Sequence, residues 1–151
     1  MTRTTRSVIT SSPEETTALG RELAAGLQPP ALVLLSGELG AGKTTLVKGI
    51  VSGLGLAREE DVTSPSFVFV HVYGNGARLY HVDLYRAEQP AELETLGLED
   101  FLAERAVVVV EWAERLKLPA LRPALRVRLE AVSDSERRIQ IEGGGDEHST
   151  A

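Results

Sequence analysis

The first third of the chain switches between strand-like and helical spacing of its hydrophobic residues. Residues 6–10 predict a short strand. Apolar residues then recur at helical spacing up to about Leu27, where two nearby prolines end the pattern. Ser12 marks the start of this helix, because a proline follows it and Glu15 stands three residues later. This arrangement is typical of an N-cap with a capping box.

The next segment predicts a strand, a glycine-rich turn and a helix in immediate succession. Residues 31–36 form a continuous apolar run, as in a strand that is buried on both faces. Three glycines follow within residues 37–42. A helix is predicted from Lys43 to about Leu54, with Gly55 at its C-terminal stop.

The second half of the chain predicts further strands around one helix. Residues 67–73 and 77–82 are strand-like, and the Gly-Asn-Gly sequence between them predicts a hairpin. An amphipathic helix is predicted over residues 90–104. Four consecutive valines predict a central strand over residues 106–110, and alternating apolar and charged residues predict a half-exposed strand over residues 125–131.

The end of the chain repeats the strand pattern and then becomes polar. Ile139 and Ile141 continue the alternation, and residues 143–151 are expected to form a disordered tail. No internal repeat or long linker divides the chain, so we expect a single domain over residues 1–142. The order of elements predicts an α/β fold with a mostly parallel central sheet, flanking helices and an antiparallel hairpin.

Composition supports one globular domain. The chain has 151 residues, of which 42% are hydrophobic and 25% are charged. It contains no cysteine, which excludes a disulfide framework, thiol chemistry and cysteine-ligated zinc. No apolar run approaches membrane-spanning length, and the N-terminus lacks the apolar core of a signal peptide. We therefore expect a cytoplasmic protein.

Charge argues against tight nucleic-acid binding by this chain alone. There are 16 basic and 22 acidic residues, which give a net charge of −6. The signs are unevenly spread: residues 87–104 contain six acids and no base, and residues 115–138 contain seven bases and three acids. We interpret these runs as solvated faces, with a partner surface as the alternative.

Residues 37–44 match the sequence G-x-x-x-x-G-K-[ST] in full, between an apolar strand and a helix. The glycines allow backbone N–H groups to turn toward phosphate, and the helix N-terminus adds a partial positive charge. We expect Lys43 to reach the β and γ phosphates, Thr44 to ligate Mg²⁺ and Thr45 to contact the α phosphate. The motif predicts a P-loop NTPase domain. Its nucleotide-binding residues are Gly37, Glu38, Leu39, Gly40, Ala41, Gly42, Lys43, Thr44 and Thr45.

Two acids end predicted strands and could both reach a nucleotide at the carboxyl edge of the sheet. Glu111 follows four valines, which is the Walker B pattern, and we assign it to the metal. Asp83 follows a less uniformly apolar strand, and we assign it to the attacking water or to the surroundings of the metal. The two roles could be exchanged, and either carboxylate could instead be a capping or salt-bridge group.

Four further residues are weaker candidates. Ser64 and Ser66 flank a proline where nucleotide switches sense the γ phosphate, although both are also ordinary turn residues. Arg86 could neutralise transition-state charge or pair with a local acid. Trp112, the single tryptophan, follows Glu111 and is expected beside the site or as a core or surface anchor.

His81 and Asp83 lie two residues apart on one strand face, a spacing that could hold a metal if a third ligand were present. No Asn-Lys-x-Asp segment occurs, so the guanine-reading element of common GTPases is missing. Arg122 and Arg126 have a spacing that could suit a kinase lid, but Arg126 already fits the outward face of the strand over residues 125–131. A small-molecule kinase shares the P-loop and is the alternative function, although the sequence shows neither a clear lid nor a clear second substrate pocket. A nucleotide-dependent scaffold without useful turnover is a third reading.

These motifs resemble one family. Residues 36–45, 64–67, 81–86 and 111–114 read SGELGAGKTT, SPSF, HVDLYR and EWAE in that order, and residues 11–16 are similar too. The chain resembles the bacterial TsaE (YjeE) family of small P-loop ATPases, which are needed to make threonylcarbamoyladenosine in tRNA. The likeness covers roughly residues 8 to 142.

The resemblance implies ATP and Mg²⁺ as cofactors, with Thr44 and Glu111 as metal ligands and Asp83 in support of hydrolysis. It also implies that residues 64–67 act as a switch. One departure is Ser66, where the family more often has threonine. Because the hydroxyl group is kept, we expect altered packing and not lost function.

The resemblance also implies partners. These are the TsaD and TsaB subunits, with ATP turnover resetting the complex between modification cycles and tRNA engaged only indirectly. Adenine contacts in the family involve the N-terminal segment and late strands, which map onto Ser12 and Arg137 here.

Overall fold

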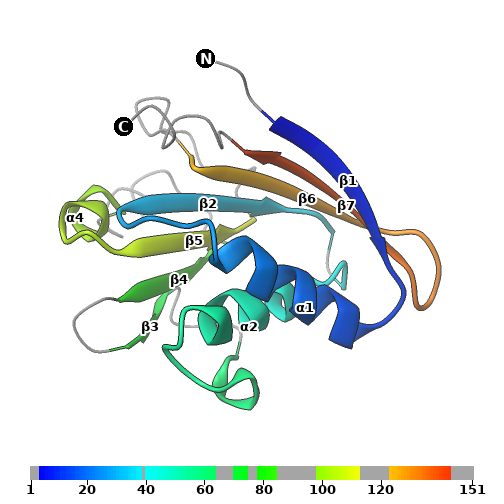
Figure 1. Ribbon diagram of the computed structural model, residues 1–151, viewed down its shortest axis with the longest axis horizontal. Coiled ribbons are helices and arrows are strands. Elements are labelled where there is room, and N and C mark those ends of the chain that lie inside the picture. The colour runs from blue at the N-terminus through cyan, green and yellow to red at the C-terminus, as the bar shows by residue number, and fades with distance from the viewer. Residues whose placement is uncertain are drawn as a thin grey trace.

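One seven-stranded sheet forms the centre of the molecule, with the strand order β1-β7-β6-β2-β5-β4-β3 (Figure 1). The computed structural model describes residues 4–38, 40–63, 70–74, 78–84, 98–112 and 123–143. The strands are β1 Thr4–Thr10, β2 Ala31–Ser36, β3 Val70–Tyr73, β4 Leu79–Asp83, β5 Val107–Glu111, β6 Leu125–Ala131 and β7 Arg137–Gly143. The helical elements are α1 Pro13–Ala24, α2 Lys43–Gly53, α4 Leu98–Ala103 and the short 3₁₀ helix η1 Glu59–Asp61.

The sheet is mixed, which corrects the expectation of a mostly parallel one. The neighbouring pairs β6–β2, β2–β5 and β5–β4 are parallel, whereas β1–β7, β7–β6 and β4–β3 are antiparallel. The predicted hairpin is present as β3–β4, and β6–β7 forms a second one. Strand β1 joins the outer edge of β7 over its full length, a long-range pairing that alternation within either strand does not specify.

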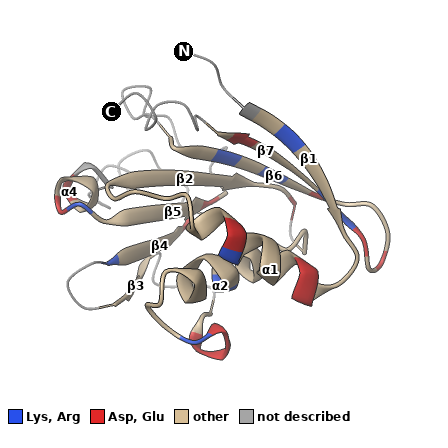
Figure 2. Ribbon diagram, viewed as in Figure 1, with Lys and Arg blue, Asp and Glu red and all other residues tan. Residues whose placement is uncertain are grey.

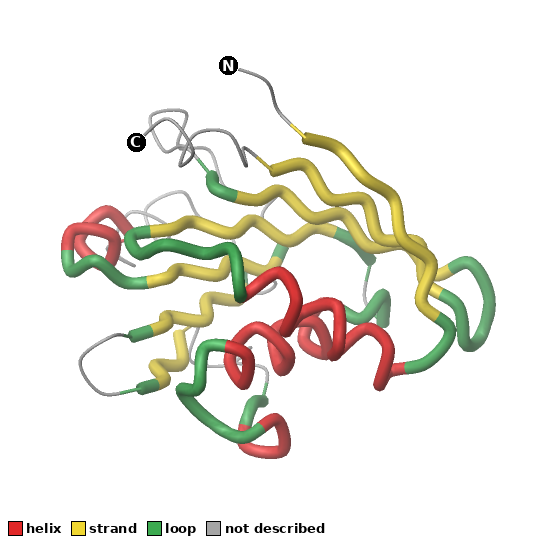
Figure 3. The backbone as a smooth tube through the Cα atoms, in the orientation of Figure 1, coloured by secondary structure: helices red, strands yellow, loops and turns green. Residues whose placement is uncertain are grey.

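Apolar layers cover both faces of the central strands, as the continuous apolar run in residues 31–36 predicted. On one face, Val33 and Leu35 of β2 pack into the cluster beneath α1 and α2. On the other face, Leu32 and Leu34 belong to a second cluster, against which Phe101 of α4 packs. Figure 3 shows α1 and α2 side by side on the same side of the sheet. Burial on both faces stabilises β2 as the rigid strand that precedes the glycine-rich loop.

Helix α1 begins as predicted and ends earlier. The Ser12 hydroxyl accepts a hydrogen bond from the Glu15 N–H at 3.1 Å, as the N-cap prediction requires. The Glu15 carboxylate accepts from the Ser11 N–H at 2.6 Å, one residue before the partner of a regular capping box. The helix ends at Ala24 because the next three N–H groups bond back to carbonyls three residues earlier, which tightens the last turn and still buries Leu27.

Two glycines allow α1 and α2 to approach closely. A Cβ atom on Gly49 would lie 2.0 Å from the carbonyl oxygen of Thr17, and one on Gly20 would lie 2.3 Å from that of Leu46. Neither position can hold a larger residue unless the helices move apart. The contact holds α2, and with it the loop that precedes α2, against α1.

The remaining predicted elements are described in part. Helix α2 starts at Lys43 and ends one residue before the predicted Leu54, and Gly55 follows with φ of 74°. Of the helix predicted over residues 90–104, α4 is the described part. Strand β7 includes Gly143, where the tail was expected to begin, and residues 144–151 lie outside the described part. Within the described residues, none of the helices has the length and apolar character needed to cross a membrane.

Candidate functional site

The glycine-rich loop joins the end of β2 to the start of α2 through backbone conformations that favour glycine. Gly37, Gly40 and Gly42 have φ angles of 142°, 84° and 101°. A Cβ atom on Gly37 would also lie 2.4 Å from the carbonyl oxygen of Leu129 in β6. The loop therefore needs glycine at Gly37 for two reasons, the positive φ and the close approach of a neighbouring strand.

The N-terminus of α2 is suited to an anion. Its N-cap residue is Gly42, and within the described residues no side chain caps it. The first turn carries no acid, and Thr45 lies in it half-buried. Backbone N–H groups at such an end bind phosphate well, and the helix dipole adds positive potential. Ala41 tightens the loop through a backbone bond to the Glu38 carbonyl at 3.0 Å. Leu39 lies outside the described residues.

The predicted phosphate lysine is folded into its own loop. Lys43 is buried, with 5% of its surface exposed. Its Nζ atom donates to the carbonyl oxygens of Gly37 at 2.5 Å and of Glu38 at 3.0 Å, and it lies 4.1 Å from the centroid of the Trp112 ring. Trp112 adopts φ of 61°, which is rare for a residue with a side chain. Both places considered for Trp112 are observed: its ring lies beside Lys43 and also packs against the second apolar cluster.

The two predicted acids lie at the same edge and on the same face of the sheet. Asp83 ends β4, Glu111 ends β5, and the two are partners in the parallel register. Alternation places both on the face that α2 covers, in line with the buried Leu79 and Val109. Both are buried, with 2% and 3% of their surfaces exposed. This arrangement places two buried carboxyl groups at the edge of the sheet where β2 enters the glycine-rich loop.

A short chain of hydrogen bonds joins Glu111 to α2 and to β4. The Thr44 hydroxyl donates to Glu111 Oε2 at 2.9 Å. His81 Nε2 lies 2.5 Å from the same oxygen. Because the Thr44 hydroxyl donates its proton to Glu111, the lone pairs of the Thr44 oxygen stay available for a metal ion. The sequence-based prediction did not include the His81 contact, because it joins residues 30 positions apart on different strands.

A hydroxyl and two carboxylates fit Mg²⁺ better than they fit zinc. Within the described residues, no group of three or more histidine, cysteine or acidic side chains could hold a metal by itself. The metal pair considered for His81 and Asp83 is therefore not supported. Mg²⁺ needs few protein ligands, because it keeps several waters and takes oxygens from bound phosphates. Thr44 and Glu111 supply that kind of incomplete oxygen set.

Of the two residues predicted to contact adenine, Arg137 contacts the glycine-rich loop, whereas Ser12 caps helix α1. The Ser12 hydroxyl accepts the N-cap hydrogen bond of α1 from the Glu15 N–H. Arg137, at the start of β7, donates to the Gly40 carbonyl of the loop at 3.3 Å and also to the Ser133 and Glu136 carbonyls. Arg137 thus braces the loop from the β6–β7 hairpin.

Helix α1 also reaches the loop through Thr16, a residue that no sequence motif singled out. A Cβ atom on Gly42 would lie 4.0 Å from its methyl group. The buried hydroxyls of Thr10 and Thr16 form a hydrogen bond of 2.7 Å. The first turn of α1 therefore lies against the loop.

The predicted switch begins at the edge of the described structure. Ser64, Ser66 and Arg86 lie outside the described residues. Thr63, just before the switch, donates its N–H to the Tyr73 hydroxyl at 3.4 Å, and burial raises the pKa of that hydroxyl. The Thr63 carbonyl lies 3.2 Å from a ring nitrogen of His71. Strand β3 thus holds the entry to this segment.

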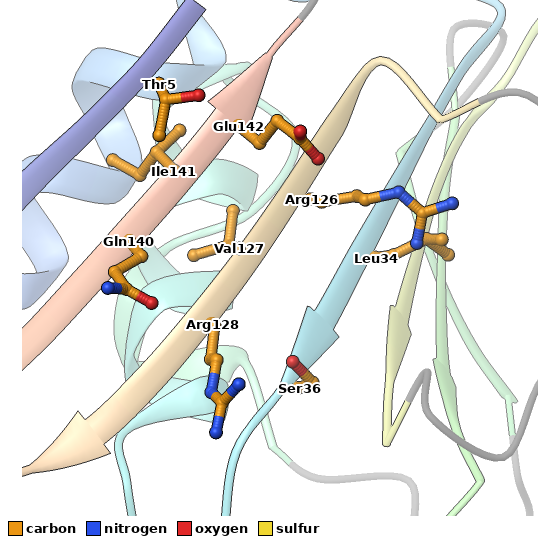
Figure 4. A pocket seen from close by; sticks show the side chains of 9 residues that line it. All are labelled: Thr5, Leu34, Ser36, Arg126, Val127, Arg128, Gln140, Ile141 and Glu142. Atoms are coloured by element: carbon orange, nitrogen blue, oxygen red, sulfur yellow. The ribbon is translucent and has the colours of Figure 1, made fainter.

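A cavity of about 470 Å³ lies on the sheet face opposite α1 and α2. Figure 4 shows the side chains of Arg126 and Arg128 on β6, with Ser36 of β2 close to Arg128. Of the described loop residues 37–38 and 40–45, none lines it. Its lining is Thr5, Leu34, Ser36, Arg126, Val127, Arg128, Gln140, Ile141 and Glu142.

Charges elsewhere on the described elements are mixed in sign. Figure 2 shows basic and acidic residues together near η1 and on the loop between β6 and β7. Arg58 pairs with Asp61 at 3.1 Å, and Arg138 pairs with Glu130 at 3.1 Å. Such exposed pairs are worth little in stability. Of the two charged runs interpreted as solvated faces, residues 87–97 and 115–122 lie outside the described residues.

A sequence model described as "Threonylcarbamoyl adenosine biosynthesis protein TsaE" matches residues 10–139. The chain belongs to the TsaE family. A TsaE protein of Bacillus subtilis is 38% identical over 140 residues, which cover 92% of this chain and 86% of that protein. A TsaE protein of Streptomyces coelicolor is 42% identical over 141 residues, which cover 88% and 93%.

The fold agrees with a solved structure. The crystal structure of YdiB from Bacillus subtilis superposes with a TM-score of 0.76 and 32% sequence identity, covering 99% of this chain and 93% of that one. The TsaE match spans β2, the loop, α2, β4 and β5, so the elements that carry Lys43, Thr44, Asp83 and Glu111 all lie within it.

Proposed function

We propose that this TsaE family member is a Mg²⁺-dependent ATPase that acts in threonylcarbamoyladenosine modification of tRNA. The observation that carries the proposal is the 2.9 Å hydrogen bond from the Thr44 hydroxyl to Glu111, beside the buried Lys43. A P-loop hydroxyl and a strand-end carboxylate in contact are the pair that NTPases of this class use to hold the metal.

Binding follows from the loop geometry. The N–H groups of the loop and of the first turn of α2 would cradle the phosphates, and Thr45 would contact the α phosphate. Lys43 would exchange the carbonyls of Gly37 and Glu38 for the β and γ phosphates. This exchange is favourable, because a bond to an anionic oxygen is stronger than one to a neutral carbonyl.

Hydrolysis needs groups that orient water and neutralise charge. Thr44 and Glu111 would hold Mg²⁺, which when bound neutralises negative charge on the phosphates. Asp83, buried at the same edge, would orient the attacking water or act through water beside the metal. The assignment of the two acids could be exchanged. From the sequence, we also propose that Ser64 and Ser66 act as a switch that senses the γ phosphate. Arg86 is proposed to neutralise charge in the transition state.

The pathway and partners extend this proposal. The relatives bear names of tRNA threonylcarbamoyladenosine biosynthesis proteins. We propose that this chain works with TsaD and TsaB on the adenosine next to the anticodon, that ATP hydrolysis resets their complex, and that tRNA is engaged only through it. A net charge of −6 supports indirect contact with tRNA.

Steady-state ATP hydrolysis tests the proposal. Turnover is measured for the isolated chain, with and without Mg²⁺, and after addition of TsaB and TsaD. We expect slow Mg²⁺-dependent hydrolysis that the partners stimulate, with the Lys43→Ala variant inactive in every mixture. Hydrolysis that is as fast alone as in the mixture would contradict the partner-dependent function.

A small-molecule kinase is the second candidate, and the cavity beside Ser36 favours it. Arg126 and Arg128 line this cavity and could bind an anionic phosphate acceptor. A screen of phosphate acceptors with labelled ATP distinguishes the two functions. Transfer of the labelled phosphate to an acceptor molecule in place of water would favour the kinase function over the ATPase function.

A further inference from the structure

His81 is a polar residue in an otherwise apolar position. It lies in the middle of β4, between two strands, and none of its surface is exposed. Its register partner on β5 is Val109, which is also fully buried. A buried imidazole in such a place costs free energy unless its nitrogens are hydrogen-bonded. Its presence therefore requires an explanation beyond packing.

The two ring nitrogens have different surroundings. Nε2 lies 2.5 Å from Glu111 Oε2, in a contact whose partners are 0% and 4% exposed. Nδ1 is buried, and among the described residues it has no hydrogen-bond partner. A contact between Nε2 and a carboxylate oxygen requires the proton to lie on Nε2. The geometry thus selects the tautomer in which Nε2 donates and Nδ1 keeps its lone pair.

Both described contacts of the Glu111 carboxylate meet at one oxygen. Thr44 donates to Oε2 from α2, and His81 donates to the same atom from β4. The Thr44 hydroxyl would also contact the metal ion and the nucleotide, so its hydrogen bond to Glu111 is open to change when they bind. The imidazole of His81 lies in β4 between two neighbouring strands, so its position does not depend on the glycine-rich loop.

We infer that His81 is a positioning residue for the metal site: it fixes the rotamer of Glu111, so that the carboxylate faces Thr44 before the metal arrives. The inference rests on the proposed role of Glu111 as a Mg²⁺ ligand. Hydrogen-bond partners of metal ligands typically contribute about 10- to 100-fold to metal affinity.

The test measures metal affinity apart from turnover. The ADP complex of each folded variant is titrated with Mn²⁺ and followed by electron paramagnetic resonance, and ADP affinity is measured without metal. The variants are His81→Gln, whose amide nitrogen can take the place of Nε2, and His81→Asn, whose amide is too short to do so. Val82→Ala is the matched control, because Val82 is the next residue of β4, equally buried, and faces the other cluster.

We expect His81→Asn to weaken Mn²⁺ binding about 10- to 100-fold and to leave metal-free ADP affinity unchanged. His81→Gln should restore Mn²⁺ binding to within about threefold of wild type, and Val82→Ala should bind Mn²⁺ as wild type does. Wild-type metal affinity in His81→Asn, or an equal loss in His81→Gln, would overturn the inference. Absence of any Mg²⁺ or Mn²⁺ effect on ADP binding by the wild type would instead defeat the proposed function itself.

A measurement on the wild-type protein keeps the inference testable if a variant fails to fold. Nitrogen NMR of the histidine rings reports which nitrogen carries the proton. Substitution of the other two histidines, His71 and His148, identifies the His81 signals by elimination. We expect a protonated Nε2 and an unprotonated Nδ1. The opposite tautomer would remove the donor on which the inference depends.

Discussion

The ammonium group of Lys43 lies 4.1 Å from the centroid of the Trp112 ring, and Trp112 directly follows the strand-end acid Glu111. The backbone of Trp112 adopts φ of 61° directly after β5 ends. The ring and two loop carbonyls together hold Lys43 where phosphate is proposed to bind. Because the chain has a single tryptophan, its fluorescence reports on the surroundings of this lysine.

Replacement of Lys43 by alanine should weaken ATP binding about 10- to 100-fold. The variant would lose the proposed charge-assisted hydrogen bonds to phosphate, each worth about 1.5–3 kcal/mol. Tryptophan fluorescence should change on addition of ATP to the wild type and not to this variant at the same concentration. Lys48→Ala is the control, because the Lys48 ammonium donates to the Val62 carbonyl at 2.7 Å, away from the loop. Equal ATP affinity in folded Lys43→Ala and wild type would show that the loop does not bind phosphate.

The two acids should have separable effects. Glu111→Ala should weaken Mg²⁺-dependent nucleotide binding about tenfold or more, because it removes the proposed metal ligand and the hydrogen-bond partner of Thr44. Asp83→Ala should keep nucleotide affinity and lower turnover about 10²-fold. Titrations with and without Mg²⁺, together with turnover assays, distinguish them. The reverse pattern would mean that the two carboxylates have exchanged roles.

Replacement of Arg137 should weaken nucleotide binding by the loop and leave the contribution of Mg²⁺ unchanged. Arg137→Ala removes the 3.3 Å bond to the Gly40 carbonyl, a loss of about 0.5–1.5 kcal/mol. We expect nucleotide affinity to fall about two- to tenfold, and its dependence on Mg²⁺ to stay unchanged. Arg138→Ala is the neighbouring control, because Arg138 pairs with Glu130 on the surface. If both variants bind nucleotide equally well, Arg137 does not brace the loop.

Gly49→Ala should destabilise the fold, although alanine is the better helix former. Helix propensity alone would add about 1 kcal/mol of stability. The new Cβ atom, however, would lie 2.0 Å from the Thr17 carbonyl oxygen, and forcing the helices apart costs about 1–3 kcal/mol. Urea unfolding measures the net change. Gly26→Ala is the control, because its nearest atom would be 3.8 Å away, and a Gly49→Ala variant as stable as wild type would refute the tight helix contact.

Local sequence was sufficient wherever a feature depends on neighbouring residues. The spacing of apolar residues predicted the strand over residues 31–36 and the helix from Lys43, and both are observed. Ser12 was predicted as an N-cap, because a cap bonds to a residue three positions away. The loop sequence and the acid after four valines could be recognised for the same reason, since a strand, a turn and a helix start are short-range structures.

Tertiary structure alone decided which distant residues meet. The bonds from Thr44 to Glu111, from His81 to Glu111 and from Arg137 to the loop join residues 67, 30 and 97 positions apart. Alternation within a strand indicates which side chains share a face, but not which strand lies beside it. For this reason the sequence predicted a mostly parallel sheet, whereas the observed sheet is mixed. The glycine-rich loop of this chain could therefore be recognised from its sequence, whereas the contacts that His81, Trp112 and Arg137 make around it became visible only once the order of the strands was known.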